Sequence, residues 1–311
     1  MDFRRLGTSG LKVSEVGLGC NNFGMRLDQA GTDAVVNACL DNGITFFDTA
    51  DVYGASKSET MLGEALKGKR HEVVLATKFA MPMGPGPDQR GGSRRYVMSA
   101  VEASLKRLQT DYIDLYQMHR PDPDTPVEET LSALDDLVTQ GKVRYLGNSN
   151  FTGWQIADAD WIARNEHLNR FVSAQNNYSL LERNVEFEVI PACERFGLGM
   201  LPFFPLASGL LTGKYQRGEA PPEGTRMAAW GARGAAALND KNFDKLEELS
   251  AYANGHGHTL LKLAFAWLLG HGVVSSVIAG ATGPEQVKAN ADAAAWRLTP
   301  AEVEEVSALA A

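Results

Sequence analysis

The chain repeats one unit along most of its length: a short apolar run, a polar loop, and a segment whose apolar residues have helical spacing. Eight apolar runs can be counted, at residues 16–19, 45–48, 73–78, 113–119, 143–149, 171–175, 199–203 and 276–280. Alternating strands and helices form right-handed βαβ units, which place their strands in one parallel sheet. Eight such units in 311 residues predict a closed (β/α)8 TIM barrel, an α/β fold, and we expect residues 1–311 to form a single domain.

Some segments lie outside this repeat. Residues 3–6 and 11–13 flank a glycine-bounded turn, which predicts a β-hairpin before the barrel. Two loops, 79–92 and 212–240, are longer than the others, and loops of this length in a compact domain are often functional. Three threonines stand three residues before a glutamate, the spacing of a capping box, and predict helix starts: Thr125, Thr282 and Thr299. The last of these predicts a C-terminal helix.

The composition limits the kinds of partner. A net charge of −8 and the lack of a large Lys/Arg cluster argue against binding to nucleic acid or to a membrane surface. Cys20, Cys39 and Cys193 lie far apart and form no CxxC pair, so we expect neither a disulfide framework nor a metal site. The N-terminus lacks an apolar signal core, and no apolar run reaches the roughly 18 residues of a membrane span. We therefore expect a cytoplasmic protein.

Chemically active side chains follow three consecutive apolar runs. Asp48 ends one run and Tyr53 follows it in the next loop, while Lys78 and His119 end the next two runs. The carboxyl ends of parallel strands meet at one rim of a barrel, so we expect these four side chains to converge. Tyrosine holds its proton to a pKa of about 10, so a catalytic phenol needs a cation beside it, and Lys78 is available. Such a tyrosine can give a proton to a carbonyl oxygen as negative charge develops there.

The rest of the predicted rim is polar with one aromatic residue. Its members are Ser149, Asn150, Gln175, Phe203 and Gly280. One histidine and one carboxylate are too few for a di-metal site, and the rim offers no Ser or Cys nucleophile with a paired base. A Rossmann fingerprint is also absent from the sequence, because Asn22 stands where the third glycine is needed.

Taken in order, these motifs resemble the aldo-keto reductase family. The segments that carry the resemblance are DTADVYG (48–54), ATKF (76–79), MHRPD (118–122), GNSN (147–150), PLASG (205–209) and GAT (280–282). They cover nearly the whole chain and are closest in style to bacterial members and to the potassium-channel β-subunit branch. The resemblance implies a barrel that binds NADP(H) at its rim without a Rossmann domain.

The resemblance also implies a role for each of the four rim residues. Asp48, Tyr53, Lys78 and His119 match the catalytic tetrad of the family. Tyr53 would protonate the substrate oxygen and Lys78 would lower its pKa. Asp48 would hold Lys78, and His119 would orient the carbonyl group. The implied reaction is reduction of a small aldehyde or ketone to an alcohol by an NADP-dependent oxidoreductase.

A second set of residues matches the family's cofactor-binding positions. By resemblance Ser149, Asn150 and Gln175 would bind the nicotinamide carboxamide and Phe203 would stack on its ring, while Lys214 and Arg226 would meet the 2′-phosphate. The remaining matched positions are Pro205, Leu206, Gly280, Thr282, Gln286 and Asn290. The chain departs from the branch at two places, with Phe204 where a serine is usual and Ala289 where an acidic residue is usual.

Two other functions compete with the reductase. One is a cofactor-binding regulatory subunit with slow reductase activity, as the channel-subunit resemblance allows. The other is a lyase in which Lys78 forms a Schiff base, although Asp48 is placed to keep that lysine charged. The motifs specify neither the substrate beyond a carbonyl compound nor an oligomeric partner.

Overall fold

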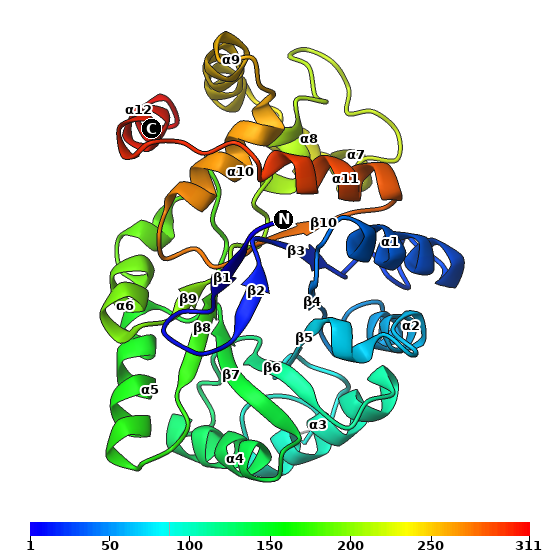
Figure 1. The fold of residues 1–311 in the computed structure, drawn as a ribbon, viewed down its shortest axis with the longest axis vertical. Helices are drawn as coiled ribbons and strands as arrows, with labels where there is room; N and C mark the ends of the chain where they lie inside the picture. Colours follow the sequence, from blue (N-terminus) through cyan, green and yellow to red (C-terminus); the bar gives the residue numbers. More distant parts are fainter. Residues whose placement is uncertain (87) are drawn as a thin grey trace.

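The computed structural model describes residues 1–86 and 88–311. At its centre, eight parallel strands curl into a ring with helices around the outside (Figure 1). In ring order the strands are β10 (Val277–Gly280), β3 (Val16–Gly19), β4 (Phe46–Asp48), β5 (Val74–Phe79), β6 (Ile113–Met118), β7 (Val143–Ser149), β8 (Phe171–Gln175) and β9 (Gly199–Met200). These are the eight runs expected from the sequence, and the (β/α)8 barrel is confirmed.

The ring closes between β9 and β10 through separate backbone hydrogen bonds rather than a regular ladder. The Met200 amide donates to the Val273 carbonyl at 2.8 Å, and the Ile278 amide donates to the Pro202 carbonyl at 3.1 Å. β9 ends at Met200, three residues before the end expected from the sequence. Pro202 has no N–H to donate to a neighbouring strand, so a continuous ladder cannot extend through it.

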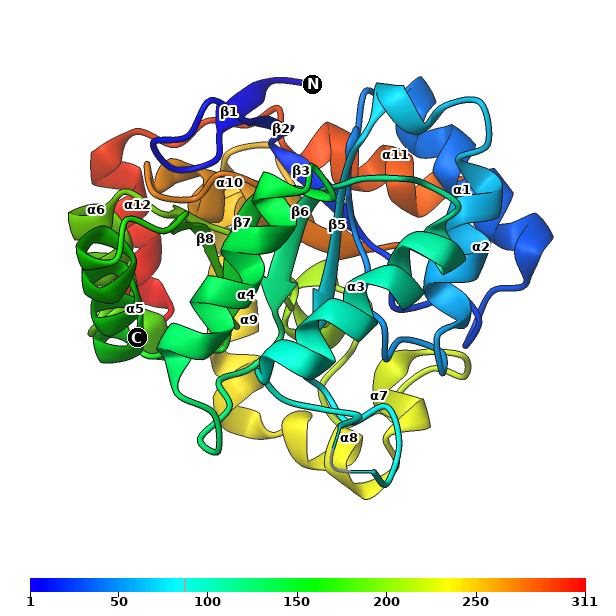
Figure 2. The same cartoon turned by 90° about the horizontal axis from the view of Figure 1, so that it is seen from below.

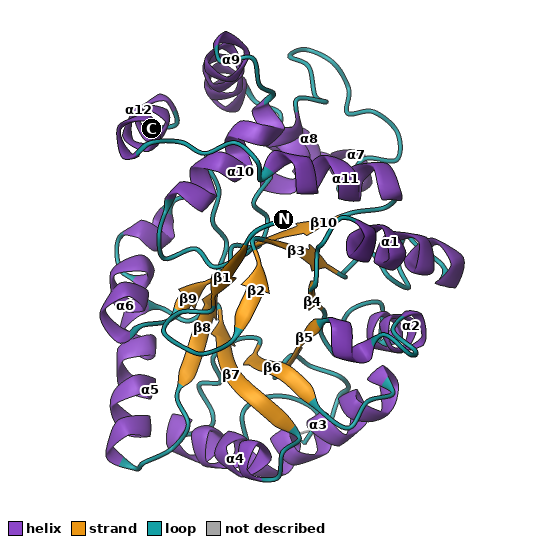
Figure 3. Ribbon diagram, viewed as in Figure 1, coloured by secondary structure: helices purple, strands orange, loops and turns teal. Residues whose placement is uncertain are grey.

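Helices cover the ring on all sides, as Figure 3 shows in purple around the orange strands. They are α1 (Gln29–Asp41), α2 (Lys57–Ala65), α3 (Arg94–Leu108), α4 (Val127–Thr139), α5 (Gly153–Asn165), α6 (Val189–Phe196), α7 (Arg226–Ala229), α8 (Ala232–Ala237), α9 (Asp240–Gly255), α10 (Leu260–Gly270), α11 (Pro284–Ala293) and α12 (Pro300–Leu309). The short helices α7 and α8 lie in the expected long loop 212–240. The final helix, α12, is the predicted C-terminal helix.

One of the three predicted capping boxes is confirmed. Thr299 caps α12 in a complete box with Glu302. The other two predictions were wrong by one residue, since Pro126 is the N-cap of α4 and Gly283 is the N-cap of α11. In α11 a proline takes the first helical position, for which its fixed φ suits it, so the cap falls on the residue just before it.

The predicted hairpin is also confirmed, as β1 (Phe3–Arg5) paired with β2 (Lys12–Ser14). It covers one end of the barrel, while α7 and α8 lie at the opposite end (Figure 2). Leu6 and Val13 from the hairpin segment are fully buried in a cluster inside the ring. The turn between the strands passes so close to the chain at residues 197–199 that a Cβ on Gly7 would lie 2.3 Å from the Gly197 carbonyl oxygen.

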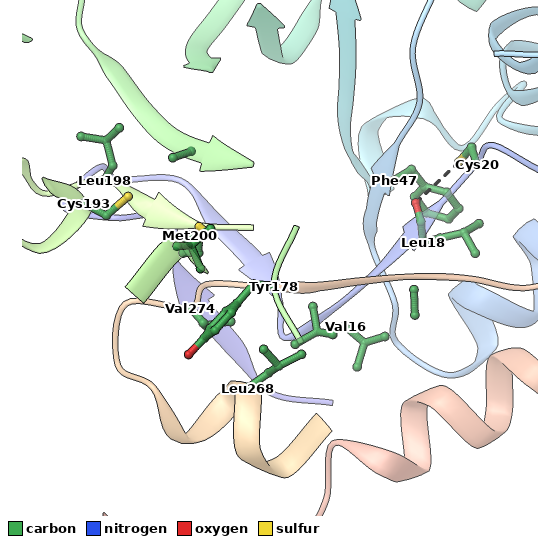
Figure 4. Close-up of a cluster of buried hydrophobic side chains, with 14 of the residues drawn as sticks. Val16, Leu18, Cys20, Phe47, Tyr178, Cys193, Leu198, Met200, Leu268 and Val274 are labelled. Carbon is green, nitrogen blue, oxygen red and sulfur yellow. Dashed lines mark hydrogen bonds between the residues drawn. The ribbon is translucent and has the colours of Figure 1, made fainter. Parts of the chain in front are cut away.

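The alternation of side chains along each strand divides the core in two. Phe46 faces the inside of the ring, where it packs with Leu115 and the hairpin residues. The next residue, Phe47, belongs to the larger core between the strands and the helices. Figure 4 shows part of this outer core, with Leu18 and Phe47 side by side. Successive side chains of a strand point to opposite faces, so each strand contributes to both layers.

The inner cluster should carry a large share of the fold's stability, and two phenylalanines test this. Phe46→Ala removes a fully buried ring and should lower the free energy of unfolding by about 3–5 kcal/mol. Phe187→Ala removes a ring that is 85% exposed and should change it by no more than about 0.5 kcal/mol. Urea unfolding followed by circular dichroism would measure both. Equal effects of the two substitutions would contradict the division of the core described above.

Candidate active site

A cavity of about 730 Å³ opens at the carboxyl ends of the strands, the end away from the hairpin. Asp48, Tyr53 and His119 line it, as do all twelve residues expected to bind a cofactor. Lys78 lies behind the wall and is fully buried. The structure therefore gathers the expected residues around one cavity, with the lysine sealed beneath it.

Lys78 and Asp48 form a buried ion pair between neighbouring strands. The Lys78 ammonium donates to Asp48 Oδ2 at 2.6 Å and to the Thr49 carbonyl oxygen at 2.8 Å. Burial lowers the pKa of Lys78, but the negative charge of Asp48 and the Tyr53 phenol raise it more, so the pKa lies above its ordinary value. The lysine is therefore charged at neutral pH.

The second oxygen of Asp48 accepts two further hydrogen bonds. Gln117 Nε2 and Gln175 Nε2 both donate to Asp48 Oδ1, each at 2.9 Å. Gln175 was expected at the site, whereas sequence reasoning missed Gln117. It precedes His119 by two residues on the same strand, and the two-residue period of a strand would have placed both on the inner face.

Tyr53 lies in the cavity wall beside both Lys78 and His119. Its ring meets the His119 imidazole edge to face, with centroids 5.7 Å apart, and the Lys78 ammonium lies 5.1 Å from its centroid. Burial raises the pKa of the phenol, Lys78 lowers it through its charge and a hydrogen bond, and Asp48 raises it. The pKa lies above its ordinary value because burial outweighs the lysine. Tyr53 is thus a neutral acid at neutral pH.

His119 is also neutral over the whole physiological range. Burial, together with the charges of Lys78 and Arg120, lowers the pKa of its imidazole to about 3. Its carbonyl oxygen accepts a hydrogen bond from Asn150 Nδ2 at 2.9 Å, which ties the ends of β6 and β7 together. A neutral imidazole can donate one hydrogen bond into the cavity without carrying a charge.

The amides near β7 and β8 form a polar patch on the cavity wall. Ser149 Oγ donates to the Gln175 carbonyl oxygen at 2.8 Å and accepts from Asn150 Nδ2 at 3.0 Å. Gln175 donates its amide to Asp48, and among the described residues no protein donor reaches its side-chain oxygen. Phe203 stands next to this patch in the cavity wall. An amide oxygen facing an aromatic ring across a cavity fits a flat ligand that carries an amide group.

The other arm of the cavity holds three cations. They are Lys214, Arg226 and Arg26, and among the described residues none of them forms an ion pair with a carboxylate. Burial and the nearby charge of Arg26 lower the pKa of Arg226. Three cations without a protein anion match a phosphate-bearing ligand. Arg26 was missed by sequence reasoning because it stands alone in a polar loop.

Two departures from the family pattern also lie in this arm. The Phe204 ring lies 5.3 Å from the Arg226 guanidinium carbon, so it packs against that cation rather than offering a hydroxyl group. Ala289 lines the cavity together with Thr282, Gln286 and Asn290, near the start of α11. Gln286 Oε1 accepts from the Thr282 amide at 2.9 Å. The segment that begins with Gly280 therefore forms the far wall of the cavity.

Metal-dependent and membrane-spanning classes find no support here. Within residues 1–86 and 88–311, no three His, Cys, Asp or Glu side chains lie close enough to hold a metal ion. None of the helices that the structure describes has the length and apolar character needed to cross a membrane.

A (β/α)8 barrel with a neutral tyrosine beside a buried lysine is the architecture of a barrel oxidoreductase. Residues 15–311 match the model of the Aldo/keto reductase family. The chain belongs to this family, whose members use nicotinamide cofactors and act on carbonyl substrates. The resemblance noted in the sequence is thereby confirmed.

Individual relatives agree with this membership. The chain is 41% identical over 299 residues to an uncharacterized oxidoreductase of Bacillus subtilis (strain 168), covering 93% of this chain and 89% of that protein. It is 36% identical over 308 residues to a probable aldo-keto reductase of Glycine max, covering 97% and 87%. It is 37% identical over 318 residues to a probable voltage-gated potassium channel subunit beta of Oryza sativa subsp. japonica, covering 99% and 96%.

The neutral state of His119 should make the protein sensitive to acid. The unfolded chain takes up a proton at this histidine near pH 6.5, whereas the folded protein resists until about pH 3. The free energy of unfolding should therefore fall below pH 6.5 by up to about 1.4 kcal/mol per pH unit from this group alone. His119→Asn should remove that slope between pH 6.5 and pH 5 in urea unfolding curves. His71→Asn, at an exposed histidine, is the control and should leave the slope as in the wild type. Parallel curves for wild type and His119→Asn would contradict the pKa given above.

Proposed function

We propose that this protein is an NADPH-dependent reductase of aldehydes or ketones, with Tyr53 as the proton donor. The observation that carries the proposal is the position of Tyr53, a neutral phenol in the cavity wall between the buried Lys78–Asp48 pair and the neutral His119. When bound, NADPH would supply the hydride that reduces the carbonyl carbon. The chain's own residues must then supply the proton and stabilise the oxygen.

Each residue of the tetrad has a distinct task in this proposal. Tyr53 donates its proton to the carbonyl oxygen as negative charge develops there. The fixed charge of Lys78 stabilises the phenolate that remains, and Asp48 keeps the lysine charged and in place. His119 donates a hydrogen bond to the same carbonyl oxygen and so orients the substrate. Tyr53 is not acidic enough in the ligand-free protein to lose its proton to water, which suits a group that must arrive at the reaction protonated.

The binding residues of the proposal divide between the two arms of the cavity. Ser149, Asn150 and Gln175 would hold the carboxamide, and Phe203 would stack on the nicotinamide ring. Lys214 and Arg226 would bind the 2′-phosphate, which NADPH has and NADH lacks. The remaining contacts would come from segments at the mouth of the cavity and at α11: Pro205, Leu206, Gly280, Thr282, Gln286 and Asn290.

A second candidate is a regulatory subunit that binds the same cofactor and turns over slowly. It is favoured by the similarity to the rice protein and to an Arabidopsis thaliana protein of the same printed description, 38% identical over 297 residues. The intact tetrad gives the reductase the stronger support. The Schiff-base alternative is weaker, since Lys78 is fully buried and held in its charged form, which is not nucleophilic.

Tyr53→Phe tests the proton donor. The substitution removes one hydroxyl group and keeps the ring, so turnover of an aldehyde panel should fall by at least about 100-fold, the size of a lost general acid. The dissociation constant for NADPH, followed by tryptophan fluorescence, should stay within about threefold, because no binding residue changes. Turnover that survives the substitution would refute the assignment of Tyr53.

Neutralising Lys214 and Arg226 together tests the choice of cofactor. Lys214→Met with Arg226→Gln should weaken NADPH binding by about 10- to 100-fold, since hydrogen bonds to charged groups are lost. NADH binding should change by less than about threefold. Arg217→Gln is the control, because this arginine lies on the same loop but pairs with Asp240, Asp244 and Glu247. Equal losses for both nucleotides would contradict recognition of the 2′-phosphate.

A further inference from the structure

Gln117 is a buried polar side chain that the proposed reaction leaves without a task. It is fully buried on β6 and lies outside the residues that line the cavity, so it can touch neither substrate nor cofactor. Its Nε2 nevertheless reaches Asp48 Oδ1 at 2.9 Å. It therefore contacts the carboxylate of the tetrad from below.

The barrel interior makes room for this glutamine. Gln117 pairs in register with Gly147 on β7. A Cβ on Gly147 would lie 3.0 Å from Gln117 Cγ and 2.4 Å from Ser173 Oγ, so any larger residue at 147 would compete with the glutamine for space. Gln175 Nε2 also approaches Gln117 Oε1 at 3.4 Å. The amide of Gln117 is thus held on both sides.

The two glutamines on Asp48 face different surroundings. Gln175 lines the cavity and has a side-chain oxygen available to a ligand, so its amide is shared between the ligand and Asp48. Gln117 is sealed away from the cavity, and its hydrogen bond to Asp48 does not depend on what is bound. It is therefore the permanent donor to this oxygen.

A permanent donor matters because of the alternative state of the buried pair. A buried carboxylate and a buried ammonium can move one proton and become a neutral acid and a neutral amine. Hydrogen bonds donated to the carboxylate favour its charged form and therefore oppose this transfer. If the transfer occurred, Tyr53 would lose the charge that stabilises its phenolate.

We propose that Gln117 is a positioning residue of the active site, which keeps Asp48 ionised and turned toward Lys78 so that the ammonium remains charged beside Tyr53. This inference rests on the proposed role of Tyr53 as proton donor. Gln117 acts only through Asp48 and Lys78 and makes no contact with reacting atoms.

The test reads the ionisation of Tyr53 directly in the cofactor-free protein. A fluorinated tyrosine is placed at position 53, since it is a stronger acid than tyrosine and titrates at lower pH, and its fluorine NMR shift is followed against pH. Gln117→Met keeps the volume and removes the donor. The titration midpoint should rise by roughly one pH unit, because the lowering effect of Lys78 on the Tyr53 pKa exceeds the raising effect of Asp48.

The control is Leu115→Met, which lies two residues earlier on the same inner face of β6 and should leave the midpoint unchanged. The other titratable groups that face Tyr53 are Lys78, Asp48, Cys20 and His119, and both variants retain all four. If Gln117→Met does not fold, Gln117→Glu is used instead. This isosteric variant adds a second acid beside Asp48 and should also raise the midpoint.

Turnover gives a second measurement. Gln117→Met should lower kcat for carbonyl reduction by about 10- to 100-fold, the loss of one or two factors of ten expected for a hydrogen bond to a charged group, with KM within about threefold. A midpoint that stays in place, or that moves equally in Leu115→Met, overturns the proposal. Failure of the proposed function itself would appear elsewhere, as turnover that survives Tyr53→Phe.

Discussion

The site depends on one costly interaction, the ion pair between Lys78 and Asp48 inside the barrel wall. A buried ammonium is destabilised by several kcal/mol unless it is paired and hydrogen-bonded. Here the carboxylate comes from β4 and the lysine from β5, and the Thr49 carbonyl oxygen completes the ammonium's partners. A slip of one residue between these strands would turn one partner outward, so the register of the sheet and the chemistry of the rim are specified together.

The barrel separates this polar site from the part that stabilises the fold. At the hairpin end the interior is filled by apolar side chains such as Phe46 and Leu115. At the opposite end the interior is filled by amides, a carboxylate and an ammonium. The polar layer is tolerable because its members satisfy one another, with Gln117 and Gln175 bound to the same oxygen of Asp48.

Much of this arrangement could be predicted from the sequence. The strand runs and the residues at their ends follow from periodicity, and parallel strands bring those ends together whatever the details of packing. Gln117 and Arg26 were missed because each is a single polar residue whose partner is distant in the chain and belongs to another element. The net acidity of Tyr53 was also out of reach, since it depends on how deeply the ring is buried. The starts of α4 and α11 shifted by one residue through local proline chemistry.

The closure of the ring between β9 and β10 divides the molecule mechanically. The pair Lys78–Asp48 is held by neighbouring strands with regular ladders, whereas β9 pairs through only two residues before the chain enters the segment with Phe203 and Leu206. That segment forms one wall of the cavity. Compliance is thus concentrated on the side of the barrel that encloses a ligand, and the acid–base side stays stiff. Such a barrel can widen or narrow around different guests without disturbing the proton inventory of its reactive centre.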